Sequence, residues 1–356
     1  MSTFFVLVMI VSLPTVQTYL DDWHDTLRNR TIPVRIFLPN MPQPHASHAP
    51  NGDNSPPTLF PVILLSHGLG GSRDGFGYLG EDWSKHGYVV LVMQHPGSDN
   101  TVSAERRSGE TRLQALTRAV NAEEANHRVG DVRFILDELE RRNQSDNPLN
   151  KKNKLTEKST EKLTEKAEKS IEKPDKKIDK KLAGKIDLNR IGMGGHSFGS
   201  QTTLAAVGRL PYKPEPRIKA ALVMSPNTPK GIDPIRIHQN IKTPLLHLTG
   251  TNDRSPINKD FDPTERRIPF DNITGTDQYL VIFKDGNHLL FSGHTRLFGL
   301  SAAEKKCQPL IAELTRRFFD AYLKEDIEAK TWLRGKGFAE QIHEVGTLEI
   351  KIGSEP

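Results

Sequence analysis

The chain has 356 residues, of which 35% are hydrophobic, 49 are Lys or Arg and 44 are Asp or Glu. This length and apolar content predict one large or two ordinary folded domains and exclude a wholly disordered chain. The single cysteine, Cys307, excludes an intramolecular disulfide and any zinc site built from paired cysteines.

The excess positive charge lies in one segment. Residues 151–181 hold 12 Lys against five Glu and two Asp, which accounts for the whole formal net charge of +5. A nucleic-acid groove needs basic residues spread over a folded face. Because this run has no aromatic residue and the rest of the chain is neutral, we expect no nucleic-acid partner.

Residues 4–13 (FFVLVMIVSL) form an apolar run near the N-terminus. The run is shorter than the about 20 residues that a spanning helix needs, so we expect no stable membrane span. Residues 1–20 are interpreted as a possible signal or other N-terminal apolar segment, with a buried strand as the alternative. If residues 1–17 act as a signal peptide the protein is secreted or periplasmic, and otherwise it is cytoplasmic.

Short apolar runs then alternate with longer segments of helical period. The predicted strands are residues 32–38, 61–66, 88–93, 190–194, 218–224, 244–249 and 279–283, and the predicted helices are residues 77–85, 112–142, 201–207 and 303–322. Residues 40–57 are rich in Pro and Asn and predict a loop, in which His45 and His48 are expected to be solvated. The alternation predicts an α/β fold with a mostly parallel central sheet and helices on both faces.

One segment departs from this pattern. Residues 143–185 repeat Lys and Glu at four-residue steps with sparse apolar positions, which indicates a solvated surface insertion; a docking arm for an acidic partner or a membrane is the alternative. The insertion would interrupt a single domain of residues 21–325. Residues 326–356 form a C-terminal extension that packs on the domain or on a second subunit, so the oligomeric state stays open.

The strand at residues 190–194 runs into the sequence GHSFG and then into a helical segment. A GxSxG turn between a strand and a helix predicts a nucleophile elbow, in which the Ser side chain is exposed on a strained turn. The flanking glycines let neighbouring backbone approach. We therefore predict Ser197 as the nucleophile.

A glycine-rich loop, His67-Gly68-Leu69-Gly70-Gly71, follows the strand at residues 61–66. Acyl transfer needs two N–H donors for the oxyanion, one from the residue after the nucleophile and one from such a loop. The prediction for these donors is the backbone N–H groups of Phe198 and Leu69. A plain tight turn is the alternative interpretation of the loop.

A serine nucleophile needs a base and an acid that orients the base. In enzymes with a nucleophile elbow the serine comes first in the chain, then the acid and then the histidine, and the last two follow late strands. Asp253 and His288 occupy those positions. His294 is the alternative base, while Asp285 is too close in sequence to His288 and Asp262 lies further into its loop. Three other histidines near strand ends are expected to be structural: His67, His95 and His196.

With these motifs in hand, the chain resembles the α/β-hydrolase superfamily and, within it, the dienelactone-hydrolase-like and platelet-activating-factor-acetylhydrolase-like serine esterases. The matching motifs lie between about residues 23 and 323 and are RNRTIPVRIFLP, FPVILLSHGLGG, YLGEDWSKHGYVV, QHPGSD, GGHSFGSQT, HLTGTNDRSP and GNHLLFSG. The resemblance implies a serine hydrolase without cofactor or metal that cleaves esters through an acyl-enzyme.

The chain departs from these relatives at two points. Dienelactone hydrolases proper use a cysteine nucleophile, whereas this chain has Ser197. The acetylhydrolases place their acid after the strand that follows the elbow helix, where this chain has Ser225-Pro226-Asn227 and no carboxylate. The acid is therefore expected one strand later, at Asp253.

These residues predict cleavage of small-molecule or lipid carboxylic esters. Short acyl groups are favoured because residues 208–217 (GRLPYKPEPR) are too short and polar for the apolar lid of a long-chain lipase. A non-catalytic binding module and an amidase or peptidase on the same fold are the alternatives.

Overall fold

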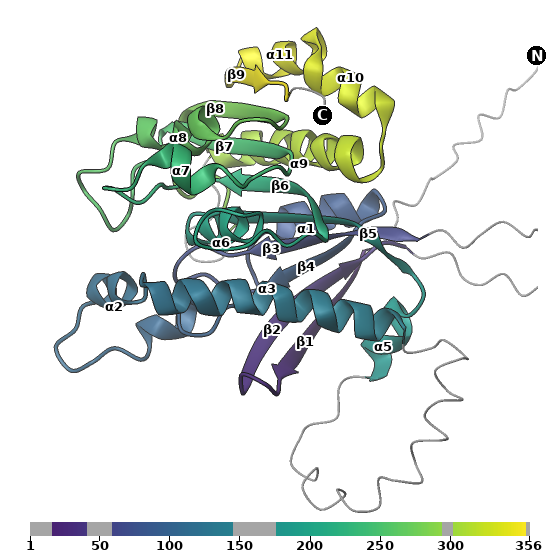
Figure 1. Cartoon of the computed structure of the whole chain (residues 1–356), viewed down its shortest axis with the longest axis vertical. Helices are drawn as coiled ribbons and strands as arrows, with labels where there is room; N and C mark the ends of the chain where they lie inside the picture. The colour runs from purple at the N-terminus through teal and green to yellow at the C-terminus, as the bar shows by residue number, and fades with distance from the viewer. Residues whose placement is uncertain (1–15, 41–58, 145–175, 294–301, 354–356) are drawn as a thin grey trace, which may run out of the picture.

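The computed structural model describes residues 16–40, 59–144, 176–293 and 302–353 (Figure 1). Within these ranges one nine-stranded sheet has the order β1-β2-β4-β3-β5-β6-β7-β8-β9. Strands β3 to β8 are parallel to one another, while β1, β2 and β9 are antiparallel to the strands they pair with. The predicted α/β fold with a mostly parallel sheet is confirmed.

The strands are β1 (Gln17–Asp25), β2 (Arg30–Leu38), β3 (Phe60–Ser66), β4 (Val89–Met93), β5 (Ile186–His196), β6 (Ile218–Met224), β7 (Leu245–Asn252), β8 (Gln278–Asn287) and β9 (Gly346–Lys351). The longer helices are α1 (Gly77–Lys85), α2 (Arg112–Arg118), α3 (Ala122–Asn143), α5 (Lys176–Leu182), α6 (Phe198–Ala206), α9 (Ala302–Leu323), α10 (Ile327–Arg334) and α11 (Lys336–His343). Four shorter elements are η1 (Asn100–Ser103), α7 (Pro234–His238), η3 (Pro263–Arg267) and α8 (Ile268–Asn272).

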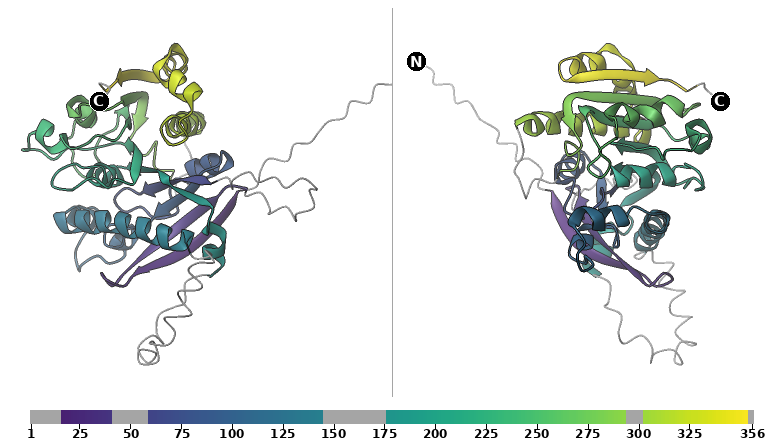
Figure 2. Two further views of the ribbon diagram at one scale, coloured as in Figure 1. Left: turned by 45° about the vertical axis from the view of Figure 1, so that its right-hand side comes forward. Right: turned by 90° about the vertical axis from the view of Figure 1, so that its left-hand side faces the viewer.

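Central strands read as unbroken apolar runs because both faces of the sheet are covered. In β3, Val62 and Leu64 pack into one core cluster and Ile63 and Leu65 into the other, and all four are fully buried. Helices α3, α5 and α6 supply side chains to the first cluster, and α1, α9, α10 and α11 to the second. Figures 1 and 2 show how the helices are arranged around the sheet. Two helical layers thus enclose the sheet.

The seven predicted strands and the helices at residues 77–85, 201–207 and 303–322 are all present, with boundaries shifted by a few residues. The predicted helix over residues 112–142 is wrong as a single element. It is broken into α2 and α3 because the Asn121 side chain accepts the Glu124 N–H and starts a new helix. Thr111 caps α2 in the same way, through a reciprocal pair with Gln114.

The C-terminal extension folds back onto the domain. Leu333, Phe338 and Ile342 from α10 and α11 are buried in the core beside α9, and β9 pairs with β8. Strands β1 and β9 were not predicted. Both lie at sheet edges and carry exposed side chains, so their apolar runs are short.

Some predictions concern residues outside the described ranges: the run at residues 4–13, His45 and His48, the centre of the insertion, and His294. At the C-terminal end of the insertion, α5 is described. Its Ile178 and Leu182 are fully buried against the sheet, so this end of residues 143–185 belongs to the core and not to a solvated surface.

We expect acid to destabilise the fold through buried His247. It is fully buried on β7 beside Phe270, and burial lowers its pKa to about 3. Below about pH 6.5 the unfolded chain binds a proton that the folded chain does not, so the free energy of unfolding falls as pH falls. This side chain alone should cost about 2 kcal/mol at pH 5 relative to pH 8.

Urea unfolding at pH 8 and pH 5 tests this expectation. His247→Gln should lose stability at pH 8 but show a difference between the two pH values that is smaller by that amount. The control is His343→Gln, at an exposed position, which should keep the wild-type difference. An unchanged difference in His247→Gln would contradict the assignment.

Candidate active site

Ser197 lies at the turn between β5 and α6, as the sequence predicts. Its backbone φ of 55° is positive, a strained conformation for a residue with a side chain. The turn is held because the Ser197 N–H donates to the Met224 carbonyl at the end of β6 over 2.9 Å. The strain therefore has a structural support on the neighbouring strand.

Glycines allow the backbone to crowd around this turn. A Cβ atom at Gly195 would overlap the Gly199 carbonyl, and one at Gly199 would overlap the Ser66 carbonyl at the end of β3. A Cβ at Gly68 would lie 3.3 Å from the Ser197 Cβ. The loop after β3 therefore lies directly against the serine.

Three side chains meet at the carboxyl ends of parallel strands. Ser197, Asp253 and His288 are each the first residue after a strand, namely β5, β7 and β8. Asn252 pairs with Asn287 in register, so Asp253 and His288 leave the sheet side by side. The distances are 2.9 Å from Ser197 Oγ to His288 Nε2 and 2.7 Å from His288 Nδ1 to Asp253 Oδ1.

The Asp253 carboxylate is fully buried and surrounded by donors. Thr249 Oγ1 donates to Oδ2 over 2.9 Å, and the Arg266 Nε lies 3.3 Å from Oδ1. Burial alone would raise the pKa of Asp253, but the hydrogen bond from His288 and the charge of Arg266 outweigh it, and the net pKa is lowered. The side chain is therefore ionised at neutral pH and accepts a hydrogen bond from His288 Nδ1.

Arg266, from η3, was not predicted from the sequence. Only 3% of it is exposed, and its Nη1 donates to the carbonyls of Ser225 and Pro226 while its Nε donates to the Asp253 carbonyl. It thus ties the end of β6 to the residue after β7. Arg266 is a charged residue in a polar part of the sequence, so no pattern in the sequence indicated that it would be buried.

The backbone of the loop after β3 orients the Leu69 N–H group. The Gly68 carbonyl accepts the Gly71 N–H over 3.0 Å and lies 2.6 Å from His67 Nδ1. In a trans peptide the Leu69 N–H points opposite to this carbonyl. Within the described residues neither the Leu69 N–H nor the Phe198 N–H has a backbone acceptor, whereas the Gly70 N–H bonds to Ser98.

The other aspartates and histidines singled out in the sequence lie outside this group of three hydrogen-bonded side chains. Asp262 caps η3, and Asp285 is exposed at a positive φ of 56°. His196 donates from Nε2 to the His288 carbonyl over 2.7 Å, and burial lowers its pKa well below the usual range. His67 and His95 are fully buried and hydrogen-bonded.

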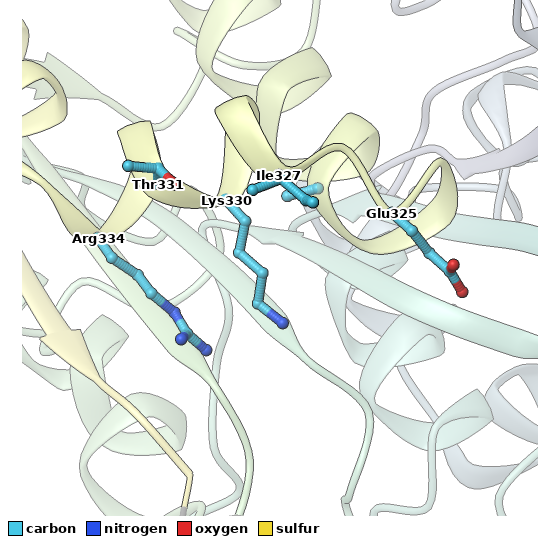
Figure 3. Close-up of a pocket in the computed structure, with 6 residues that line it drawn as sticks. Glu325, Ile327, Lys330, Thr331 and Arg334 are labelled. Carbon is cyan, nitrogen blue, oxygen red and sulfur yellow. The ribbon is translucent and has the colours of Figure 1, made fainter.

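Elsewhere in the described residues, a pocket of about 490 Å³ lies on α10, lined by Ala321, Glu325, Ile327, Lys330, Thr331 and Arg334 (Figure 3). Arg334 pairs with Asp277, which lies at the amino end of β8, whereas Ser197 lies at the carboxyl end of β5. No group of metal-ligating side chains is found in the described part of the chain. In the same residues, no helix is both long and apolar enough to cross a membrane.

The sheet order and the strand–turn–helix at Ser197 define an α/β-hydrolase fold. The family described as platelet-activating factor acetylhydrolase, isoform II, matches residues 29–226, which is more than half of the chain, and the chain belongs to this family. Among curated proteins, no match was found. Membership supports an esterase or acetylhydrolase function. The family match ends before Asp253 and His288, so it does not address these two residues.

We expect Gly199→Ala to unfold or strongly destabilise the protein. Its methyl group would overlap the Ser66 carbonyl, and backbone on both sides must move, at a cost of roughly 3 kcal/mol. Gly77→Ala is the matched control because its methyl group would come no closer than 3.9 Å to Arg35. Thermal unfolding of both variants is the measurement, and equal midpoints would contradict the close approach.

Proposed function

We propose that this protein is a serine esterase that hydrolyses carboxylic esters of short acyl groups through an acyl-enzyme on Ser197. The observation that carries the proposal is the hydrogen-bonded series Ser197–His288–Asp253, with distances of 2.9 and 2.7 Å. Membership in an acetylhydrolase family supports both the reaction class and a small acyl group.

In this mechanism His288 Nε2 takes the proton of Ser197 Oγ as the oxygen attacks the ester carbonyl. The carbonyl oxygen becomes negative and is held by the N–H groups of Leu69 and Phe198, which have no backbone acceptor among the described residues. The imidazolium then protonates the leaving alcohol as the carbon–oxygen bond breaks. Water, deprotonated by His288, then attacks the acyl carbon. The bond from that carbon to Ser197 Oγ breaks as His288 returns the proton to Oγ, and the acid is released.

Asp253 has a positioning and electrostatic role. Its carboxylate accepts a hydrogen bond from the Nδ1–H group and so keeps the proton on Nδ1. Nε2 is then free to accept the proton of the serine. Because its pKa is lowered, the carboxyl stays ionised and holds the imidazole in this tautomer.

Covalent labelling tests the nucleophile. A fluorophosphonate probe at pH 8 should modify Ser197, identified by peptide mass mapping, and Ser197→Ala should abolish labelling and ester hydrolysis while the thermal midpoint stays near that of the wild type. If the folded wild-type protein is not labelled, the esterase proposal is wrong and a binding module becomes the better interpretation.

The acid is tested with two aspartates. Asp253→Asn should lower kcat by about 10³- to 10⁴-fold because the imidazole then adopts the wrong tautomer. Asp262→Asn is the control: this exposed residue caps η3, and asparagine caps helices equally well, so kcat should stay within about twofold. Similar losses in both variants would argue against Asp253.

The acyl group is tested with a series of nitrophenyl esters. We expect kcat/KM for the acetate to exceed that for the decanoate by at least about tenfold, since transition-state binding in a small pocket discriminates by about 1 to 3 kcal/mol for small changes in apolar size. A matched acetanilide should be cleaved far more slowly than the ester. A preference for the decanoate or for the anilide would contradict the proposal.

A further inference from the structure

Arg128, on α3, is a buried cation whose direct partners are neutral. It is 0% exposed, and within the described residues it forms no ion pair. The other fully buried arginine of this helix, Arg142, pairs with Asp21, Glu138 and Asp179. Burying a charge without a paired carboxylate is costly, so the position of Arg128 calls for an explanation.

The contacts of Arg128 connect it to the two segments that carry the Leu69 and Phe198 N–H groups. Its Nη1 donates to the His67 carbonyl over 2.9 Å, immediately before Gly68, and its guanidinium lies 4.3 Å from the centre of the Phe198 ring. Its Nε donates over 2.9 Å to Ser98 Oγ, while the Ser98 carbonyl accepts the Gly70 N–H. One guanidinium therefore contacts both His67, two residues before Leu69, and Phe198, which follows Ser197.

Weaker contacts complete the arrangement. Nη1 also lies 3.4 Å from Ser66 Oγ and 3.3 Å from Thr202 Oγ1, which joins the end of β3 to α6. His67 Nε2 accepts the His95 N–H, so the ring proton lies on Nδ1 and is donated to the Gly68 carbonyl. The direction of the Gly68–Leu69 peptide follows from this arrangement.

The charged groups around Arg128 do not neutralise it directly. Asp131, Glu124 and Asp99 favour its charge and Arg30 opposes it, while Asp131 is already bonded to Arg28, Arg30 and His95. Burial lowers the pKa of Arg128 to about 9, so the guanidinium remains charged at pH 7 to 8. In a dry interior such a charge acts strongly on a nearby negative group.

We propose that Arg128 is a positioning residue of the oxyanion hole, which holds the Leu69 and Phe198 segments in place and whose charge favours the negatively charged tetrahedral intermediate. This inference rests on the esterase function proposed above. Arg128 touches no reacting atom and acts through its charge and the backbone that it holds, so it should affect kcat and leave KM nearly unchanged.

The test compares Arg128→Met, Arg128→Lys and, as a control on the same helix, Arg142→Met. Arg128→Met should lower kcat by on the order of 10- to 100-fold with KM within about twofold. It should weaken binding of a trifluoromethyl ketone, which forms a tetrahedral adduct with serine, by a similar factor. Arg128→Lys should recover part of kcat because it keeps the charge. Arg142→Met should lose stability but keep kcat.

A folded Arg128→Met with wild-type kcat and ketone affinity overturns the inference. If Arg128→Met does not fold, Ser98→Ala removes the acceptor of the Arg128 Nε together with a 3.3 Å hydrogen bond to the His95 carbonyl, and it should lower kcat by about three- to tenfold at unchanged KM. Unchanged kcat in Ser98→Ala then overturns it. If the wild-type protein shows no ester turnover that depends on Ser197, it is the esterase proposal that is refuted.

Discussion

The contact between the first turn of α6 and the backbone after β3 is the constraint on which the site depends. Because Gly199 has no side chain, the helix comes against the Ser66 carbonyl with nothing between them. The serine at the head of the helix and the Leu69 loop then become neighbours through backbone geometry. Groups fixed at the ends of strands and helices are held more exactly than groups on free loops. The geometry around Ser197 is therefore a property of the sheet and its first helical turn.

Beneath this contact lies a connected set of buried polar groups. Asp131 accepts hydrogen bonds from Arg28 and Arg30, beside the β1–β2 turn, and lies 2.9 Å from His95 Nδ1; His95 Nε2 lies 2.9 Å from Ser66 Oγ. Burial would raise the pKa of Asp131, but the bond to His95 and the arginine charge lower it, while burial lowers the pKa of His95 to about 4. The group repeats a serine–histidine–aspartate order, yet all three side chains are fully buried. Its effect is to join the N-terminal hairpin to the loop beside the nucleophile.

Local sequence patterns were sufficient for the α/β fold and for the positions of Ser197, Asp253 and His288, because buried parallel strands read as apolar runs and these residues follow such runs directly. Arg266 and Arg128 could not be found in this way. Their acceptors lie 41 residues away at Ser225 and 61 residues away at His67, so their burial depends on tertiary contacts that no local period encodes. The edge strands β1 and β9 were missed because they contain few buried residues, so their sequences lack the apolar run that distinguishes a strand from a loop.

The pairing of β9 with β8 has a consequence for the order of folding during synthesis. Residues from Gly346 to Lys351 form β9, which is synthesised after the other eight strands of this sheet. Until then β8, which ends one residue before His288, has an open edge, and α10 and α11 cannot cover the core beside α9. The elbow and the loop after β3 are made from earlier segments and can assemble first. The nucleophile side of the site is therefore expected to form before β9 has been synthesised, and the histidine side only after it.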